Sequence, residues 1–256
     1  MLMETRTAFD LATMMGPLIG AQLAPRPDFA GPLVIVAPGF GAGDASTLPL
    51  RHYLHRQGFD VEGWGLGTNL AGVDMPHRPE DLDASWEFEP RGTYRGEGSV
   101  PYLCDRFKER VQQRFAASGQ DIVLIGWSLG GYLAREVARD LPDVVVRVIT
   151  MGSPTIGGPK YTAAARFFRR KGMDLDWIEE GISNRESRPI RQPITAIYSK
   201  SDAVVSWQAA IDHHSADVNH IEVDAAHLGM GFNSAIWSHV VAALNLAVNP
   251  LKTKQK

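Results

Sequence analysis

The chain has 256 residues, of which 44% are hydrophobic and 21% charged, a composition typical of a globular protein rather than a disordered or fibrous one. The formal net charge of −3 gives no electrostatic reason to expect a nucleic-acid partner, because phosphate binding needs a basic surface. The single cysteine, Cys104, cannot form an internal disulfide, and the sequence shows no clustered set of metal ligands.

Residues 1–30 match no motif, and we expect them to pack on or precede the main domain. Glu4 and Asp10 fit poorly with the cationic start of a secretory signal, and Gly16-Pro17 interrupts the apolar stretch that follows. No apolar run reaches the roughly 18 residues needed to cross a membrane. We therefore expect no membrane span and a cytoplasmic location, with a signal peptide in residues 1–24 as the alternative.

Short apolar, β-branched runs recur along the chain with helical patterns between them. The predicted strands are residues 33–37, 121–125, 144–149, 194–198 and, as a further candidate, 220–223. Apolar residues at four-residue spacing predict helices over 129–141 and 236–248, the second stopped by Pro250. Such alternation predicts an α/β fold with one doubly wound, mostly parallel sheet.

Two long segments interrupt this alternation. Residues 68–100 are rich in glycine, proline and charge, and their role stays open. Residues 155–193 hold helical patterns at 161–170 and 175–180 and are longer than a crossover connection needs. We predict a helical cap or lid at 155–193, because loops at the carboxyl ends of strands control access to substrate sites.

The sharpest motif is Gly126-Trp127-Ser128-Leu129-Gly130, which lies between a predicted strand and a predicted helix. In that context a G-x-S-x-G sequence is typical of a nucleophile elbow, where a sharp turn holds the serine in a strained conformation with its hydroxyl exposed. The glycines allow the strand and the helix to approach closely. We therefore predict that Ser128 is a nucleophile.

A serine hydroxyl needs a base to remove its proton and an acid to orient that base. After a nucleophile elbow the acid comes first in the chain and the histidine second. Asp202 follows the predicted strand 194–198, and His227 lies on a glycine-bounded loop after the last strand, so we predict these as acid and base. Asp224 is the alternative acid. The alternative bases are His213 and His214 in a predicted helical stretch, His220 at the start of the last strand, and His239 in the last helix.

Acyl transfer also needs hydrogen-bond donors for the developing oxyanion, usually backbone N–H groups. Leu129 supplies one at the start of its helix, where N–H groups are free and the helix dipole is favourable. We predict the second donor at Phe40, with Gly41 next, in the glycine-rich loop after the first strand. The predicted substrate-binding residues are Gly39, Gly41 and Trp127. The plainer interpretation of this loop is a strand-to-helix turn with Asp44 as N-cap, and both can hold.

Four sequence blocks together resemble the lipase and esterase branch of the α/β-hydrolase superfamily, over residues 33–248. The blocks are Ala37-Pro38-Gly39-Phe40-Gly41, Gly126-Trp127-Ser128-Leu129-Gly130-Gly131, Met151-Gly152-Ser153-Pro154 and His227-Leu228-Gly229. The resemblance implies a sheet of eight or slightly fewer strands, a hydrolase core of residues 31–154 and 194–250, and cofactor-free ester hydrolysis through an acyl-enzyme. The family's usual His-Gly start of the oxyanion loop is Pro38-Gly39 here.

These patterns lead us to expect a serine esterase or lipase that acts on a small-molecule ester or acyl substrate. The predicted cap contains apolar residues that suggest an acyl or other apolar substrate, with packing inside the cap as the alternative. They are Phe167, Phe168, Trp177 and Ile178. An acyltransferase or thioesterase with the same triad stays open, because water exclusion depends on pocket shape. A non-catalytic binding protein on the same scaffold also stays open. The sequence says nothing about oligomeric state.

Overall fold

A computed structural model describes residues 31–73 and 98–248 of the chain. The expectations for residues 1–30, for most of the 68–100 segment and for Pro250 lie outside these ranges. Within the ranges, no helix has the length and apolar character needed to cross a membrane.

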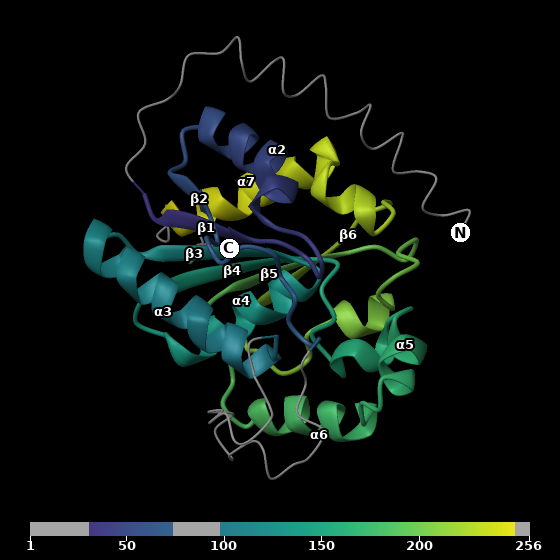
Figure 1. Ribbon diagram of the computed structural model, residues 1–256. Helices are drawn as coiled ribbons and strands as arrows, with labels where there is room; N and C mark the ends of the chain where they lie inside the picture. The colour runs from purple at the N-terminus through teal and green to yellow at the C-terminus, as the bar shows by residue number, and fades with distance from the viewer. Residues whose placement is uncertain (1–30, 74–97, 249–256) are drawn as a thin grey trace.

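Across the described residues, six parallel strands form one sheet in the order β2-β1-β3-β4-β5-β6 (Figure 1). The strands are β1 (Leu33–Ala37), β2 (Val61–Gly63), β3 (Ile122–Trp127), β4 (Val145–Met151), β5 (Ile194–Tyr198) and β6 (Val218–Glu222). The chain passes from β1 to β2 and then returns to the other side of β1 with β3. The strand order therefore reverses between β1 and β3, and ligands of open α/β sheets bind at this kind of switch point.

The structure differs from the sequence-based expectations at the edges of the sheet. β2 is an unpredicted strand, because its three residues are only half-buried and contain Glu62 and Gly63 instead of an apolar run. β6 begins at Val218, two residues before the expected start, and pairs with β5 along its full length, so His220 lies in mid-strand. The described sheet has six strands, fewer than the eight that the resemblance allows.

Helices cover both faces of the sheet (Figure 1). They are α2 (Asp44–Arg56), α3 (Val100–Ser118), α4 (Leu129–Asp140) and α7 (Ser234–Val248). In β1, Val34 and Val36 belong to the apolar core that α2 and α7 cover, whereas Leu33 and Ile35 belong to the core that α3 and α4 cover. This alternation explains why β1 and β3 are apolar and buried at every position: neither face of these strands is left to solvent.

Residues 155–193 contain the short helix η3 (Gly158–Tyr161) and the helices α5 (Ala165–Arg170) and α6 (Leu175–Arg185). α6 starts where the Asp174 side chain accepts hydrogen bonds from two backbone N–H groups of the first turn, at 3.0 Å each. Figure 1 shows α5 and α6 on the opposite side of the sheet from α2 and α7. Phe168, Ile178 and Ile182 join the core of α3 and α4, so the segment packs on the sheet domain through apolar side chains.

Candidate active site

Ser128 lies in a strained turn between β3 and α4. Its φ of 54° and ψ of −126° make it the one non-glycine residue with positive φ among the described residues. A Cβ on Gly126 would lie 2.3 Å from the Gly130 carbonyl oxygen, so a side chain there would force β3 and α4 apart. The Ser128 N–H donates to the Met151 oxygen of β4 at 2.8 Å, which holds the turn against the sheet. A strained backbone conformation persists only where the surrounding contacts hold it, as the close packing of β3 on α4 and the bond to Met151 do here.

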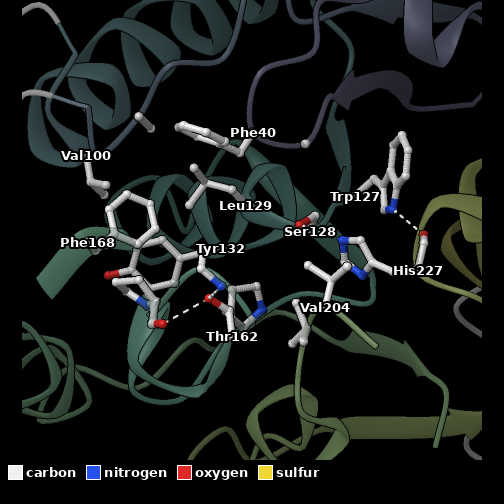
Figure 2. A pocket seen from close by; sticks show the side chains of 18 of the residues that line it. Phe40, Val100, Trp127, Ser128, Leu129, Tyr132, Thr162, Phe168, Val204 and His227 are labelled. Atoms are coloured by element: carbon white, nitrogen blue, oxygen red, sulfur yellow. Dashed lines mark hydrogen bonds between the residues drawn. The ribbon is translucent and has the colours of Figure 1, made fainter. Parts of the chain in front are cut away.

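The side chains of Ser128, His227 and Asp202 form one hydrogen-bonded chain. His227 Nε2 lies 3.0 Å from Ser128 Oγ, and His227 Nδ1 lies 2.7 Å from Asp202 Oδ2. With the histidine proton on Nδ1, the ring donates to the carboxylate and accepts from the serine hydroxyl. The Trp127 indole N–H also donates to the His227 backbone oxygen at 3.2 Å, which ties the histidine loop to β3 (Figure 2).

The carboxylate of Asp202 is fixed from both sides. Its Oδ1 accepts hydrogen bonds from the N–H groups of Val204 and Val205 at 2.7 and 2.8 Å, while Oδ2 faces His227. The alternative acid Asp224 is exposed and accepts a hydrogen bond from Ser201 Oγ at 2.9 Å. The geometry therefore favours Asp202 as the partner of the histidine.

The other candidate histidines lie elsewhere. His213 and His214 are exposed in irregular turns before β6, and they are not in the helix that their sequence context predicts, since η4 (Trp207–Ala210) ends first. His220 Nε2 accepts a hydrogen bond from the Asp212 N–H at 3.0 Å, and His239 is half-buried in α7. Among the candidate histidines, only His227 is hydrogen-bonded to Ser128 in the described structure.

Acidification is expected to destabilise the wild-type protein more than a His220→Gln variant. Burial, His213 and Arg135 lower the pKa of His220 below its ordinary value of about 6.5, while Asp212 opposes them. The folded state therefore favours the neutral ring, and its contribution to stability is present above pH 6.5 and lost as the pH falls through the lowered pKa. Glutamine accepts the same hydrogen bond without titrating.

Urea unfolding at a series of pH values between about 7 and 5 measures this effect. A His239→Gln variant is the control, and it should retain the pH dependence of the wild type. Equal pH dependence in the wild type and in His220→Gln would contradict the prediction.

The predicted oxyanion donors lie in two backbone segments near Ser128, the start of α4 and the loop after β1. Leu129 is the first residue of α4, so its N–H has no intrahelical acceptor. In the loop after β1, Gly41 N–H donates to the Asn69 oxygen at 2.7 Å and Ala42 N–H to the Gly39 oxygen at 3.2 Å. The second-choice oxyanion donor, Gly41, thus has its N–H committed, whereas Phe40 N–H has no hydrogen-bond partner among the described residues.

The same loop corrects the expectation for Asp44. Gly43, not Asp44, is the N-cap of α2, and Asp44 is the first helical residue. Its carboxylate accepts hydrogen bonds from the N–H groups of Trp64 and Gly65 at 3.0 and 3.1 Å. Asp44 therefore connects the start of α2 to the end of β2.

A cavity of about 310 Å³ opens beside Ser128 and His227 (Figure 2). Gly39, Phe40, Trp127 and Leu129 line it, whereas Gly41, an expected substrate-binding residue, does not. Further wall residues come from the 155–193 segment and are Gly158, Pro159, Thr162, Ala164, Phe168, Met173, Ile178 and Ile182. No Asp, Glu, Lys or Arg lies among the described lining residues, so the cavity suits an apolar group.

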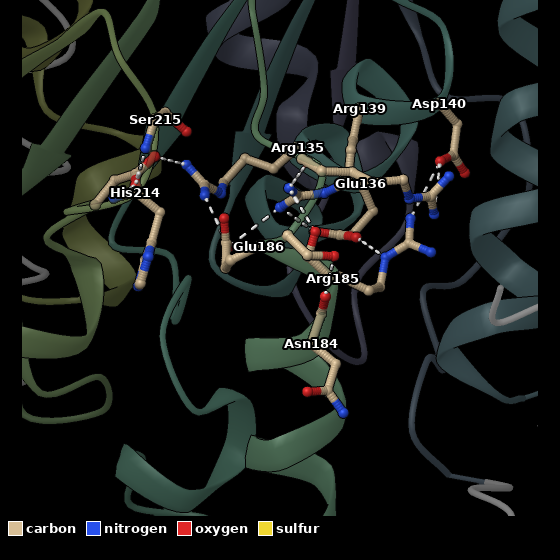
Figure 3. A network of polar contacts seen from close by, with 12 residues as sticks. Arg135, Glu136, Arg139, Asp140, Asn184, Arg185, Glu186, His214 and Ser215 are labelled. Atoms are coloured by element: carbon tan, nitrogen blue, oxygen red, sulfur yellow. Dashed lines mark hydrogen bonds and ion pairs between the residues drawn. The ribbon is translucent and has the colours of Figure 1, made fainter. Parts of the chain in front are cut away.

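A buried network of charged side chains joins α4 to the end of α6 (Figure 3). Its members are Arg135, Glu136, Arg139, Arg185, Glu186 and Asp212, each at most 9% exposed. Glu136 pairs with both Arg139 and Arg185, and Arg139 also pairs with Glu186 at 3.1 Å. Burial alone would raise the pKa of Glu136, but the neighbouring guanidinium groups outweigh it and hold that pKa below its ordinary value. The network therefore anchors one wall of the cavity to the helix that begins after Ser128.

Comparisons with curated proteins give two partial matches. The chain is 27% identical over 145 residues to a pimeloyl-[acyl-carrier protein] methyl ester esterase of Aliivibrio fischeri, covering 53% of this chain and 51% of that protein. It is 29% identical over 93 residues to the esterase of the same name from Aromatoleum aromaticum, covering 36% of this chain and 35% of that protein. The chain thus matches about half or less of the length of these curated relatives.

Solved structures share the fold at low identity. A structure described with the metagenome-derived lipolytic enzymes LipS and LipT has a TM-score of 0.59 at 13% identity, covering 85% of this chain and 95% of that one. A monoacylglycerol lipase of Paleococcus ferrophilus has a TM-score of 0.51 at 16% identity, covering 86% and 98%. The family model described as "Alpha/beta hydrolase family" matches residues 34–247. The chain belongs to the α/β-hydrolase family.

Proposed function

We propose that the protein is a serine hydrolase of carboxylic esters, with Ser128 as nucleophile, His227 as general base and Asp202 as acid. The observation that carries the proposal is the hydrogen-bonded chain from Asp202 through His227 to a strained Ser128 that lines an apolar cavity. The similarity to methyl ester esterases supports an ester as the substrate.

In the proposed mechanism, Ser128 Oγ attacks the acyl carbon while its proton passes to His227 Nε2. Asp202 stabilises the imidazolium through Nδ1–H. The N–H groups of Leu129 and Phe40 donate to the oxyanion, and the α4 dipole favours its negative charge. The alcohol leaves with the proton from His227, and water, activated by the same base, then hydrolyses the acyl-enzyme.

The substrate is proposed to place its acyl group in the cavity. Its lining is almost wholly apolar and includes Phe168, Ile178 and Ile182 from the 155–193 segment. We propose this segment as the cap of the active site, because it supplies much of the lining of the cavity beside Ser128. An apolar wall of this kind favours aliphatic acyl groups over charged ones.

A fluorophosphonate probe is expected to label the wild-type protein and to leave a Ser128→Ala variant unlabelled, because the probe reacts with an activated serine. Ser153→Ala is the matched control, because Ser153 also follows a strand at this edge of the sheet. Its hydroxyl donates to the Met151 backbone oxygen at 3.4 Å, whereas the Ser128 hydroxyl is the one hydrogen-bonded to His227. That variant should label like the wild type. Equal labelling of Ser128→Ala and the wild type, by in-gel fluorescence, would overturn the proposed nucleophile.

Turnover assays separate ester hydrolysis from the other functions open to this scaffold. Hydrolysis of p-nitrophenyl esters of graded chain length, lost in Ser128→Ala, supports the esterase. Preferential formation of a new ester in the presence of added alcohol, or a strong preference for the matching thioesters, would favour an acyltransferase or thioesterase. Absence of turnover and of labelling would favour a binding protein.

A further inference from the structure

Asn69 is a fully buried amide side chain in the loop after β2, where the chain approaches the loop after β1. Its Nδ2 donates to the Pro38 oxygen at 2.7 Å, and its Oδ1 accepts from the Ala71 N–H at 3.2 Å. The Asn69 backbone N–H donates to the Ala42 backbone oxygen at 2.8 Å, and the Asn69 backbone oxygen accepts from the Gly41 N–H at 2.7 Å. Asn69 thus forms hydrogen bonds with Pro38, Gly41 and Ala42 in the loop from Pro38 to Ala42.

That loop contains a tight turn with Phe40 at its second position. Ala42 N–H donates to the Gly39 oxygen, which closes the turn, and Gly41 at the third position has a φ of +73°. A positive φ at the third residue is the mark of a type II turn and favours glycine there. Since the Asn69 backbone oxygen accepts a hydrogen bond from Gly41 N–H, the position of the Asn69 backbone selects the orientation of the peptide group that joins Phe40 to Gly41.

The turn lies directly against the nucleophile. A Cβ built on Gly39 would stand 3.3 Å from Ser128 Cβ and 3.9 Å from Ser128 Oγ. Any shift of the turn therefore changes the position of the Phe40 N–H relative to the carbonyl that Ser128 attacks. Catalytic hydrogen bonds to an oxyanion need donors within a few tenths of an ångström of 3 Å.

We propose that Asn69 is a positioning residue for this oxyanion turn, a role that rests on the proposed function. It does not touch the substrate. Its backbone pairs with Gly41 N–H and with the Ala42 oxygen, and its side chain, hydrogen-bonded to Pro38 and Ala71, holds that backbone in place. These contacts leave the Phe40 N–H available as a donor. An asparagine side chain suits the task because it donates to Pro38 and accepts from Ala71 at once. Aspartate has the same shape but cannot donate, and alanine leaves both backbone groups buried without partners.

The test compares Asn69→Ala and Asn69→Asp with the wild type in p-nitrophenyl butyrate hydrolysis. We expect kcat to fall roughly 10- to 100-fold with KM within about twofold, because the lost interaction acts on the transition state. An aryl trifluoromethyl ketone, which Ser128 converts into a tetrahedral hemiketal alkoxide while His227 takes the proton, should lose affinity by the same factor as kcat/KM. If either Asn69→Ala or Asn69→Asp folds poorly, the other still provides the test. Circular dichroism shows which variants are folded.

Gln192→Ala is the matched control. Gln192 is also a buried amide, and its Nε2 donates to the Ala138 oxygen at 2.9 Å at the far end of α4. This variant should lose stability but keep kcat and the ketone affinity of the wild type. The proposal is overturned if folded Asn69 variants keep wild-type kcat, or if they lose no more of it than Gln192→Ala. A wild-type protein with an unreactive Ser128 would instead overturn the proposed function itself.

Discussion

Replacement of Asp202 by asparagine is expected to lower kcat/KM for ester hydrolysis by roughly 10⁴-fold, because asparagine favours the wrong tautomer of the histidine and cannot stabilise the imidazolium. Asp202 Oδ2 lies 2.7 Å from His227 Nδ1, while two backbone N–H groups hold Oδ1. An asparagine oriented with its oxygen toward those N–H groups would present its NH₂ to Nδ1. The proton would then move to Nε2, where it prevents the histidine from accepting the Ser128 proton.

Asp224→Asn is the matched control for this prediction. Asp224 is three positions from His227 and carries the same carboxylate, but it is exposed and bonded to Ser201. Its replacement should leave kcat/KM within about twofold of the wild type, since exposed hydrogen bonds contribute little. A large loss in Asp224→Asn together with a small loss in Asp202→Asn, measured by steady-state kinetics, would reverse the assignment of the acid.

Replacement of Glu136 by glutamine is expected to lower the free energy of unfolding by roughly 3–5 kcal/mol, because it leaves buried guanidinium groups without their anion. Glu136 is 3% exposed in its side chain and pairs with Arg139 at 3.3 Å and with Arg185. Glutamine fills nearly the same volume, so the loss reflects charge and not a cavity. Urea unfolding at neutral pH measures the difference.

A partly exposed cluster of three charged side chains provides the contrast for Glu136. Glu62 contacts Arg110 and Arg114, and all three side chains are about 30% exposed, so Glu62→Gln should cost less than about 1 kcal/mol. A second measurement follows the free energy of unfolding at acidic pH. The lowered pKa of Glu136 stabilises the fold above its ordinary value of about 4.5, and this contribution is lost as the pH falls below that value. Glu136→Gln should therefore lose less stability below pH 4.5 than the wild type does. Equal losses of unfolding free energy in Glu136→Gln and Glu62→Gln at neutral pH would contradict the predicted role of the network.

The α/β fold and the set of Ser128, Asp202 and His227 could be predicted from the sequence because their signals are local. The central strands β1 and β3 are apolar and buried at every position, and the G-x-S-x-G motif between a strand and a helix specifies a turn that few other sequences form. Asp202 and His227 then follow from chain order and from their places after the last two strands. The structure brings His227 within hydrogen-bonding distance of both Ser128 and Asp202.

Sequence patterns alone could not reveal features that depend on distant chain segments. β2 is too short and polar to show a pattern, and it is held by its register with β1. Asn69 gives no signal in its glycine-rich loop, because its role depends on contacts with a turn that lies about 30 positions away. Charged residues such as Arg135, Glu136 and Arg139 would be assigned to a helix surface from their type, yet the packing of α6 and the Asp212 loop buries them as pairs.

By itself, the sequence determined the class of fold and which serine, aspartate and histidine to consider, since strand burial and the nucleophile turn are properties of short segments. Only the tertiary structure decided which backbone N–H groups near Ser128 are already occupied, which residues enclose the cavity, and how the charges of α4 are neutralised. Each of these depends on which segments meet in space, and the free energy of such contacts is shared between residues far apart in the chain.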